Sequence, residues 1–265
     1  MARTKDPRHP ITKSVYWNKY FPRLDKMHVV DLKGVHAICC GSILLDLVTS
    51  PTRTAVLGAT QDQRLLEINR RMKDFQSTSG CEHYMPELRI DNLRKDGWAC
   101  LNGKLVKAAN TRQLIPFMLH LVGLFYNAHG AYASSVRKVV TALNTIEHIC
   151  YSADMFLTTS EKQTFDKAWK TVGRHWQHLR WLCRPIPGNE GFNYWQVTPK
   201  VHYAMHLPRQ SLLINVRATQ CYAEESLIGR VSKIWAASAN GRYTKMVQKT
   251  TLIRYLVSLE LRLSP

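Results

Sequence analysis

The sequence is short of acidic residues: 19 Asp and Glu stand against 37 Lys and Arg in 265 residues, a formal net charge of +18. Long apolar runs are lacking too, since Ile43–Val48 and Ile115–Tyr126 fall below the roughly 20 residues that span a bilayer. The N-terminus has basic residues with no apolar stretch behind them, unlike a secretory signal. We therefore expect a protein that is not secreted and has no membrane partner, placed in the nucleus or another reducing intracellular compartment.

Several motifs that carry chemistry are also missing. The chain has no CxxC pair, no GxxxxGK[ST] or GxGxxG phosphate loop and no GxSxG nucleophile turn. Its seven cysteines are odd in number and widely scattered, which is typical of reduced thiols in a core. The adjacent Cys39 and Cys40 lie in an apolar segment, where thiols behave as small hydrophobic groups. We do not expect a structural zinc site.

Helical periodicity dominates the rest of the chain, and period-two strands are nearly absent. With 45% hydrophobic and 21% charged residues, the composition predicts a packed core. Apolar spacing, caps and breakers predict helices at 31–48, 61–79, 86–93, 111–129, 131–157, 160–183, 199–207, 220–237 and 243–263. The predicted fold is all-α, an irregular multi-helix bundle with at most a short strand pair near 96–106.

Particular residues mark where these helices begin. Asp31 is the predicted N-cap of the first, and Thr60 with Gln63 forms a capping box for the second. Ser160, with Gln163 three positions on, is the predicted cap of the helix at 160–183. Gly34 and Gly41 are seven residues apart, a spacing that lets a neighbouring helix approach closely.

The clearest break in the pattern is a stretch rich in Pro and Gly at 185–198. We predict a flexible basic arm at 1–14, a helical core at 15–184, a linker at 185–198 and a basic helical segment at 199–265 that packs on the core.

The excess positive charge favours polyanionic partners. Basic residues of the C-terminal segment alternate with aromatic ones, an arrangement that suits phosphate pairing together with base stacking. The candidate nucleic-acid-binding residues are Lys200, Arg209, Arg217, Arg230, Lys233, Arg242, Lys245 and Lys249. The alternative is that they form the solvated side of amphipathic helices. The partner is DNA or RNA, which the sequence does not distinguish.

Two further groups are candidate metal ligands. His202 and His206, four residues apart, share one helical face, but the glutamate of an HExxH motif is absent and packing at a helix interface is the favoured interpretation. Glu224 and Glu225 lie near a helix start, where carboxylates complement the macrodipole. Alternatively, one of them binds a divalent metal together with Asp31 or Asp46, although such sites need three carboxylates and no third is evident.

The segment from Pro199 and Lys200 through His202 and His206-Leu207, followed by Glu224-Glu225, resembles the C-terminal helical region of eukaryotic cut-and-paste transposases. Val29–Val35 and Lys107–Pro116 are similar to parts of uncharacterised mobile-element proteins of dinoflagellates. The resemblance implies an RNase H-like family with three catalytic carboxylates and Mg²⁺ or Mn²⁺. Glu224 or Glu225 would match the last acidic position and Asp31 the middle one.

The first acidic residue of such families lies in an upstream β-strand, and no such strand is predicted here. This departure favours a fragment or an inactive DNA-binding remnant. The favoured function is therefore nucleic-acid binding by a mobile-element-derived protein without independent catalysis. The alternatives are a metal-dependent nuclease or strand-transferase using Glu224 or Glu225, and a viral or mobile-element structural protein that coats nucleic acid.

Overall fold

The computed structural model describes residues 24–50, 55–80, 86–102, 107–127, 130–184 and 193–220, with positions 232–234, 236 and 252–253 beyond them. The chain divides into two compact units, Met1–Thr219 and Gln220–Pro265. The described residues confirm an all-α fold, with a single two-stranded sheet among them. The predicted arm at 1–14 lies outside the described residues.

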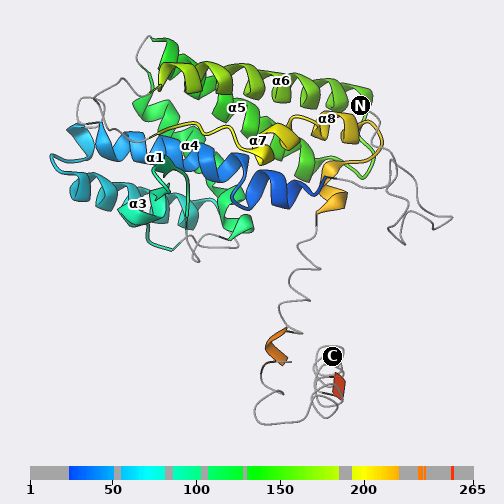
Figure 1. The fold of residues 1–265 in the computed structure, drawn as a ribbon, viewed down its shortest axis with the longest axis horizontal. Coiled ribbons are helices and arrows are strands. Elements are labelled where there is room, and N and C mark those ends of the chain that lie inside the picture. Colours follow the sequence, from blue (N-terminus) through cyan, green and yellow to red (C-terminus); the bar gives the residue numbers. More distant parts are fainter. Residues whose placement is uncertain are drawn as a thin grey trace. The chain divides into compact units, whose positions relative to one another are not determined.

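Helices of the first unit pack around α1 and α4 (Figure 1). The longer helices are α1 (Val35–Thr49), α3 (Gln61–Thr78), α4 (Ala108–Phe125), α5 (Ala131–Ser152) and α6 (Thr159–Leu182). The short ones are η2 (Met27–Asp31), η3 (Ala55–Leu57), η4 (Ile90–Leu93), α7 (Pro199–Ala204), α8 (Leu207–Ser211) and η5 (Val216–Thr219). α5 and α6 run side by side along one side of the unit, and α3 lies across α1 from them.

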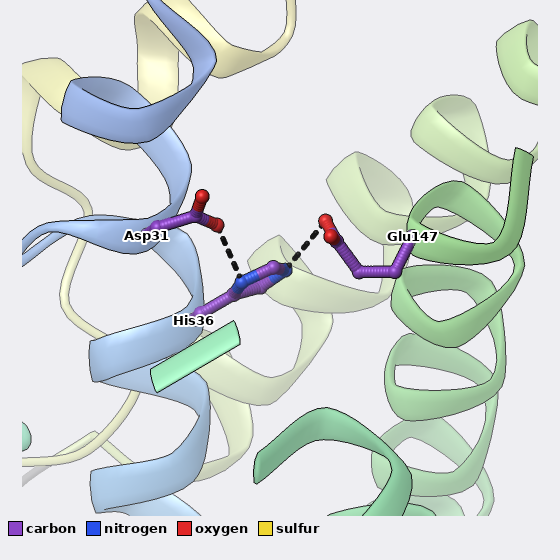
Figure 2. A group of neighbouring side chains, drawn as sticks. All are labelled: Asp31, His36 and Glu147. Atoms are coloured by element: carbon purple, nitrogen blue, oxygen red, sulfur yellow. Dashed lines mark ion pairs between the residues drawn. The ribbon is translucent and has the colours of Figure 1, made fainter. Parts of the chain in front are cut away.

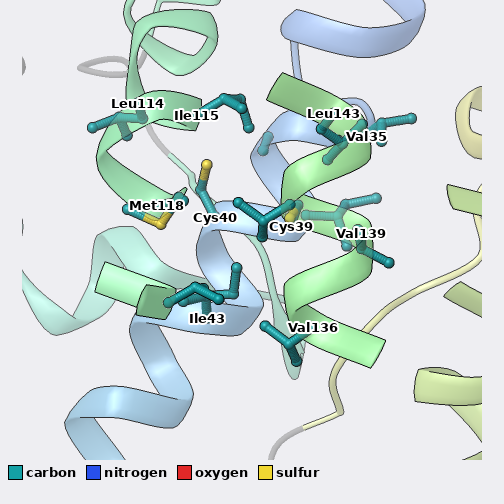
Figure 3. Close-up of a cluster of buried hydrophobic side chains, with 14 of the residues drawn as sticks. Val35, Cys39, Cys40, Ile43, Leu114, Ile115, Met118, Val136, Val139 and Leu143 are labelled. Atoms are coloured by element: carbon teal, nitrogen blue, oxygen red, sulfur yellow. The ribbon is translucent and has the colours of Figure 1, made fainter. Parts of the chain in front are cut away.

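The core is continuous from α1 through α4 to α5. Thirteen of the fifteen residues of α1 are buried, so the helix is apolar almost all round. Cys39 and Cys40 are fully buried against the apolar faces of α4 and α5, as expected for thiols used as small hydrophobes (Figure 3). The segment Met27–Thr49 has the length and composition of a membrane-crossing helix, but 78% of its most apolar window is buried within this core.

The predicted N-cap at Asp31 is wrong, and the predicted N-cap at Thr60 is confirmed. Asp31 closes the π-helical turn η2, and α1 begins after Gly34, because the Asp31 carboxylate is engaged by other side chains. Thr60 and Gln63 form the predicted capping box of α3. At α6 the cap is Thr158, boxed with Glu161, two positions before the predicted residue. A carboxylate at the third helical position completes this box and also complements the helix dipole.

The strand pair lies slightly earlier than 96–106. β1 (Arg94–Lys95) and β2 (Trp98–Ala99) pair antiparallel across Asp96 and Gly97, both at positive φ (50° and 77°). This is the two-residue turn that Asp-Gly favours in hairpins. The helix predicted at 86–93 is only the short 3-10 helix η4, because the chain enters the hairpin directly after it.

Gly41 of α1 is packed against the backbone of Cys100, the residue directly after this hairpin, rather than against a helix. A Cβ at Gly41 would lie 2.5 Å from the Cys100 Cα, and the Leu101 amide donates to the Ala37 carbonyl at 2.8 Å. Only a glycine lets the two backbones approach this closely.

The predicted boundary at 185–198 is also displaced. Trp195 is fully buried, edge-on to Trp176 with ring centroids 5.2 Å apart, and its amide donates to Ser42 Oγ. Farther along, Asn215 Nδ2 donates to the Cys150 carbonyl at 3.1 Å. Residues 193–219 therefore belong to the first unit, and the division follows Thr219.

Candidate functional site

Four ionisable side chains meet inside the first unit. Lys26, Asp31 and His36 are fully buried, and Glu147 is 8% exposed. Figure 2 shows Asp31 from the turn before α1, His36 from the first turn of α1 and Glu147 from α5, with the imidazole between the two carboxylates. The cluster thus joins segments more than 100 residues apart in the sequence.

The two nitrogen-bearing side chains face the same two oxygens. Lys26 Nζ lies 3.2 Å from Asp31 Oδ1 and 2.7 Å from Glu147 Oε1. His36 Nδ1 lies 2.9 Å from Asp31 Oδ1, and His36 Nε2 lies 3.4 Å from Glu147 Oε1. The His36 nitrogens and Glu147 oxygens are within ion-pair distance but are not aligned as hydrogen bonds, so these contacts are mainly electrostatic.

Burial by itself lowers the pKa of Lys26, but the charges of Asp31 and Glu147 outweigh it and hold this pKa above its usual value. Lys26 is therefore an ammonium ion inside the protein. Its one positive charge faces the two formal negative charges of Asp31 and Glu147. A buried arrangement of this kind links η2, α1 and α5 and is costly to break, because each remaining charge loses its partner.

The same residues offer a set of metal ligands. One donor atom each from Asp31, His36 and Glu147 lie within 4.8 Å of one another, and no other such group of three occurs among the described residues. However, Lys26 Nζ already contacts both carboxylates where a divalent ion would bind. The geometry therefore favours a structural ion-pair cluster, and Asp31 is enclosed where a phosphate backbone does not reach it.

The other candidate carboxylates do not join this cluster in the described residues. Asp46 accepts a hydrogen bond from the Tyr126 hydroxyl at 2.6 Å. Glu224 and Glu225 lie outside the described residues. Sequence analysis missed Lys26, His36 and Glu147, although a glutamate next to Ile146 in the apolar stripe of α5 was a signal that a buried partner existed.

His202 and His206 do not share one helix, because α7 ends at Ala204 and His206 lies in the following turn as the N-cap residue of α8, which begins at Leu207. Their Nε2 atoms are nevertheless 3.3 Å apart, and both side chains are exposed. Tetrahedral zinc, with Zn–N of about 2.0–2.1 Å, holds two imidazole nitrogens about 3.3 Å apart. The pair supplies two ligands only, since no third His, Cys, Asp or Glu joins it in the part of the chain described.

The predicted nucleic-acid-binding residues have different environments. Lys200 is half-buried and donates to the Leu32 carbonyl at 2.6 Å. Arg217 lies over the Tyr151 ring, 4.7 Å from its centroid, while Arg209 and Lys233 are exposed, the latter in the second unit. The remaining candidates lie outside the described residues: Arg230, Arg242, Lys245 and Lys249.

A basic groove that sequence analysis missed runs between α5 and α6. Its volume is about 370 Å³. Its described lining residues comprise three cations, four threonines, two alanines and no carboxylate. The lining residues are Arg137, Lys138, Thr141, Ala142, Thr145, Thr164, Lys167, Ala168 and Thr171. Small and polar residues at helical spacing on two antiparallel neighbours were the signal for it, visible only once the helices are paired.

Cations also gather at one end of this groove. The pKa of His175 is lowered, first by burial and then by the charges of Lys138, His178 and Arg174. Both histidines contact Ser135 Oγ through Nδ1, at 3.2 Å for His175 and 3.0 Å for His178. Positive charge is therefore crowded there without a neighbouring carboxylate in the lining.

Comparisons with known proteins found no matching family model, no matching curated protein and no matching solved structure. The resemblance to transposases is not tested by these comparisons and stays a prediction. The function must be argued from the site itself.

Proposed function

We propose that this protein binds nucleic acid through the groove between α5 and α6 and has no independent catalytic activity. The observation that carries the proposal is the charge of the groove lining: Arg137, Lys138 and Lys167 are present and no carboxylate is. Contacts between such cations and phosphates release condensed counterions, which supplies most of the sequence-independent affinity for nucleic acid.

The other lining groups suit the same ligand. Threonine hydroxyls bind phosphate oxygens, and the small side chains of Ala142 and Ala168 in the lining leave room for a backbone to lie close to the helices. From Thr164 to Arg174, α6 extends about 15 Å, a length over which duplex DNA carries about nine phosphate charges. Lys138, Lys167 and Arg174 are exposed along this length.

The buried cluster supports binding without cleavage. A nuclease or strand-transferase needs carboxylates gathered at a surface open to its substrate. Asp31 is fully buried and forms an ion pair with Lys26. The groove lining itself contributes hydroxyls and cations, which bind phosphates but do not hold a divalent cation.

The test is the salt dependence of oligonucleotide binding, measured by fluorescence anisotropy with duplex and single-stranded DNA and RNA. The variant K138Q/K167Q removes two cations of the groove. Because each phosphate contact contributes about 0.9 to the slope of log K against log salt, we expect the slope for duplex DNA to fall by about 2. The matched control R70Q/K73Q removes two exposed cations of α3, and its slope should stay near that of the native protein.

A second readout reports on the groove directly. Phosphates bound beside Lys138 and Arg174 offset the charges that lower the His175 pKa, so duplex binding should raise that pKa in an NMR titration. The proposal fails if both double variants lose the same slope, which is a general effect of net charge. It also fails if the native protein shows no salt-dependent binding to any of the oligonucleotides.

A further inference from the structure

A smaller cationic cavity lies beside the hairpin and is separate from the groove. Its volume is about 200 Å³. Lys33 comes from the turn before α1, Lys95 and Trp98 from the hairpin, Cys100 from the residues just after it, and Thr198 from the start of α7. Three segments far apart in the sequence thus line one cavity, in which polar groups stand beside the apolar side chains of Ile38 and Leu101.

Positive charge is concentrated around this cavity. Lys33 and Lys95 line it, and Lys200 is anchored next to it by donating to the carbonyl of Leu32. The pKa of Lys200 is lowered, first by burial and then by the charge of Lys33. Among the described residues of the lining, Asp96 is the one acid, and its carboxylate lies 3.9 Å from Lys95 Nζ. Three ammonium groups against one carboxylate leave a local excess of +2.

The positive charge around the cavity also affects the pKa of the Cys100 thiol. Burial raises its pKa to about 11, while Lys95, Lys33 and Lys200 each act in the opposite direction. The sulfur therefore lies within the field of all three lysines.

Lys33 has a strained backbone conformation in this position. Its φ is +52°, a left-handed conformation that a lysine rarely adopts. Packing fixes the turn, because a Cβ at the next residue, Gly34, would lie 2.1 Å from the Val29 carbonyl oxygen. Strained backbone maintained by its surroundings is common where a side chain must be presented to a ligand.

We infer that this cavity binds a small oxyanion of the inorganic phosphate type. Its volume is below the roughly 300–1,000 Å³ of pockets for larger organic ligands, and lysines act as point charges that bind phosphate. Thr198 Oγ accepts from the Val201 amide at 3.3 Å, which leaves its own hydroxyl hydrogen free to donate to the anion. The same chemistry is offered by a phosphate of a nucleic-acid backbone.

The test follows alkylation of Cys100 by iodoacetamide, resolved by peptide mass spectrometry. A bound phosphate offsets the lysines and covers the thiol. We expect about tenfold slower alkylation in phosphate than in chloride at equal ionic strength, the loss of thiolate that accompanies a pKa rise of about one. Cys183, half-buried and away from the cavity lining, is the internal control and should react equally in both salts.

The variant K33Q/K95Q changes two exposed side chains and should abolish the protection, whereas R70Q/K73Q should retain it. Circular dichroism checks the fold, and K95Q alone serves if the double variant is perturbed. A parallel arm replaces phosphate with duplex DNA. Protection by phosphate alone identifies a free oxyanion as the ligand, and protection by both means that a backbone phosphate enters the same cavity.

The inference is overturned if phosphate leaves Cys100 alkylation unchanged in the native protein, or if K33Q/K95Q is protected to the same extent. Protection by duplex DNA without protection by phosphate also overturns it. None of these outcomes depends on the groove between α5 and α6, so this site and the proposed function can fail separately.

Discussion

Replacing Lys26 tests whether its ammonium stabilises the two buried carboxylates that it contacts. In Lys26→Met, Asp31 and Glu147 lose the ammonium that lies 3.2 and 2.7 Å from their oxygens. The substitution removes one positive charge from the cluster and leaves the two carboxylates facing each other without it. Removing one partner of a buried ion pair costs about 3–5 kcal/mol, so the free energy of unfolding should fall by about that amount. For a unit of this size the melting temperature falls by about 6–20 °C.

The partner variants give the decisive comparison. Glu147→Gln leaves Lys26 and Asp31 as a one-to-one pair and should cost less than Lys26→Met. The double variant K26M/E147Q removes one charge of each sign and leaves Asp31 with His36 Nδ1 at 2.9 Å. It should therefore be more stable than K26M alone, although it carries one more substitution. Urea denaturation of the four proteins measures this coupling.

The exposed pair of Lys170 and Asp166 is the control, with its charged atoms 2.6 Å apart and side-chain exposures of 74% and 42%. Its double-mutant cycle should give a coupling below about 1 kcal/mol, because solvent screens the charges. The reasoning is refuted if the losses of K26M and E147Q simply add in the double variant. In that case Lys26 and Glu147 do not interact in solution.

Three further predictions concern packing, capping and pH. Gly41→Ala forces a Cβ against the Cys100 backbone and should lower the free energy of unfolding by about 1–3 kcal/mol. Gly123→Ala, with nothing within 4 Å of its Cβ, should raise the free energy of unfolding by about 0.5–1 kcal/mol. Urea denaturation measures both variants. Thr158→Ala should lower the free energy of unfolding by about 1 kcal/mol, because it removes the N-cap of α6, whereas Ser160→Ala should lower it by less than about 0.5 kcal/mol. A larger loss in Ser160→Ala than in Thr158→Ala would contradict the assignment of Thr158 as the cap. Among the described residues, burial raises the pKa of the fully buried thiols of Cys39, Cys40 and Cys150 above the ordinary 9.0, so these thiols stay protonated in the fold while those of the unfolded chain ionise. Stability in reductant should therefore fall as the pH rises above 9, by about 4 kcal/mol from these thiols at pH 10 relative to pH 7, and an unchanged value there would show that they ionise in the native state.

Local chemistry explains which elements could be predicted. The capping box at Thr60 and the helix of 24 residues at α6 follow from side chains within four positions of one another. The Asp-Gly turn is local as well, and it places the hairpin. α4 begins at Ala108, earlier than predicted, and continues through Pro116, because packing on α1 and α5 maintains a helix that the proline alone disfavours.

Long-range contacts explain what was missed. Asp31 has the composition and position of an N-cap, but its carboxylate meets Lys26 and His36 beside a glutamate of α5. Gly41 has the spacing of a helix-packing glycine, yet the backbone that approaches it is that of Cys100, directly after the hairpin. Neither partner can be identified by a rule that considers neighbours along the chain.

The sequence alone determined the helical class, the buried reduced thiols and the surplus of positive charge, because periodicity and composition act residue by residue. Only the tertiary structure decided where that charge is available for a ligand. Lys200 donates to a carbonyl and Arg217 stacks on a ring, whereas Lys138 and Lys167 remain exposed beside the same groove. The distinction arises because pairing of α5 with α6, and docking of the hairpin on α1, place cations together that the chain order keeps apart.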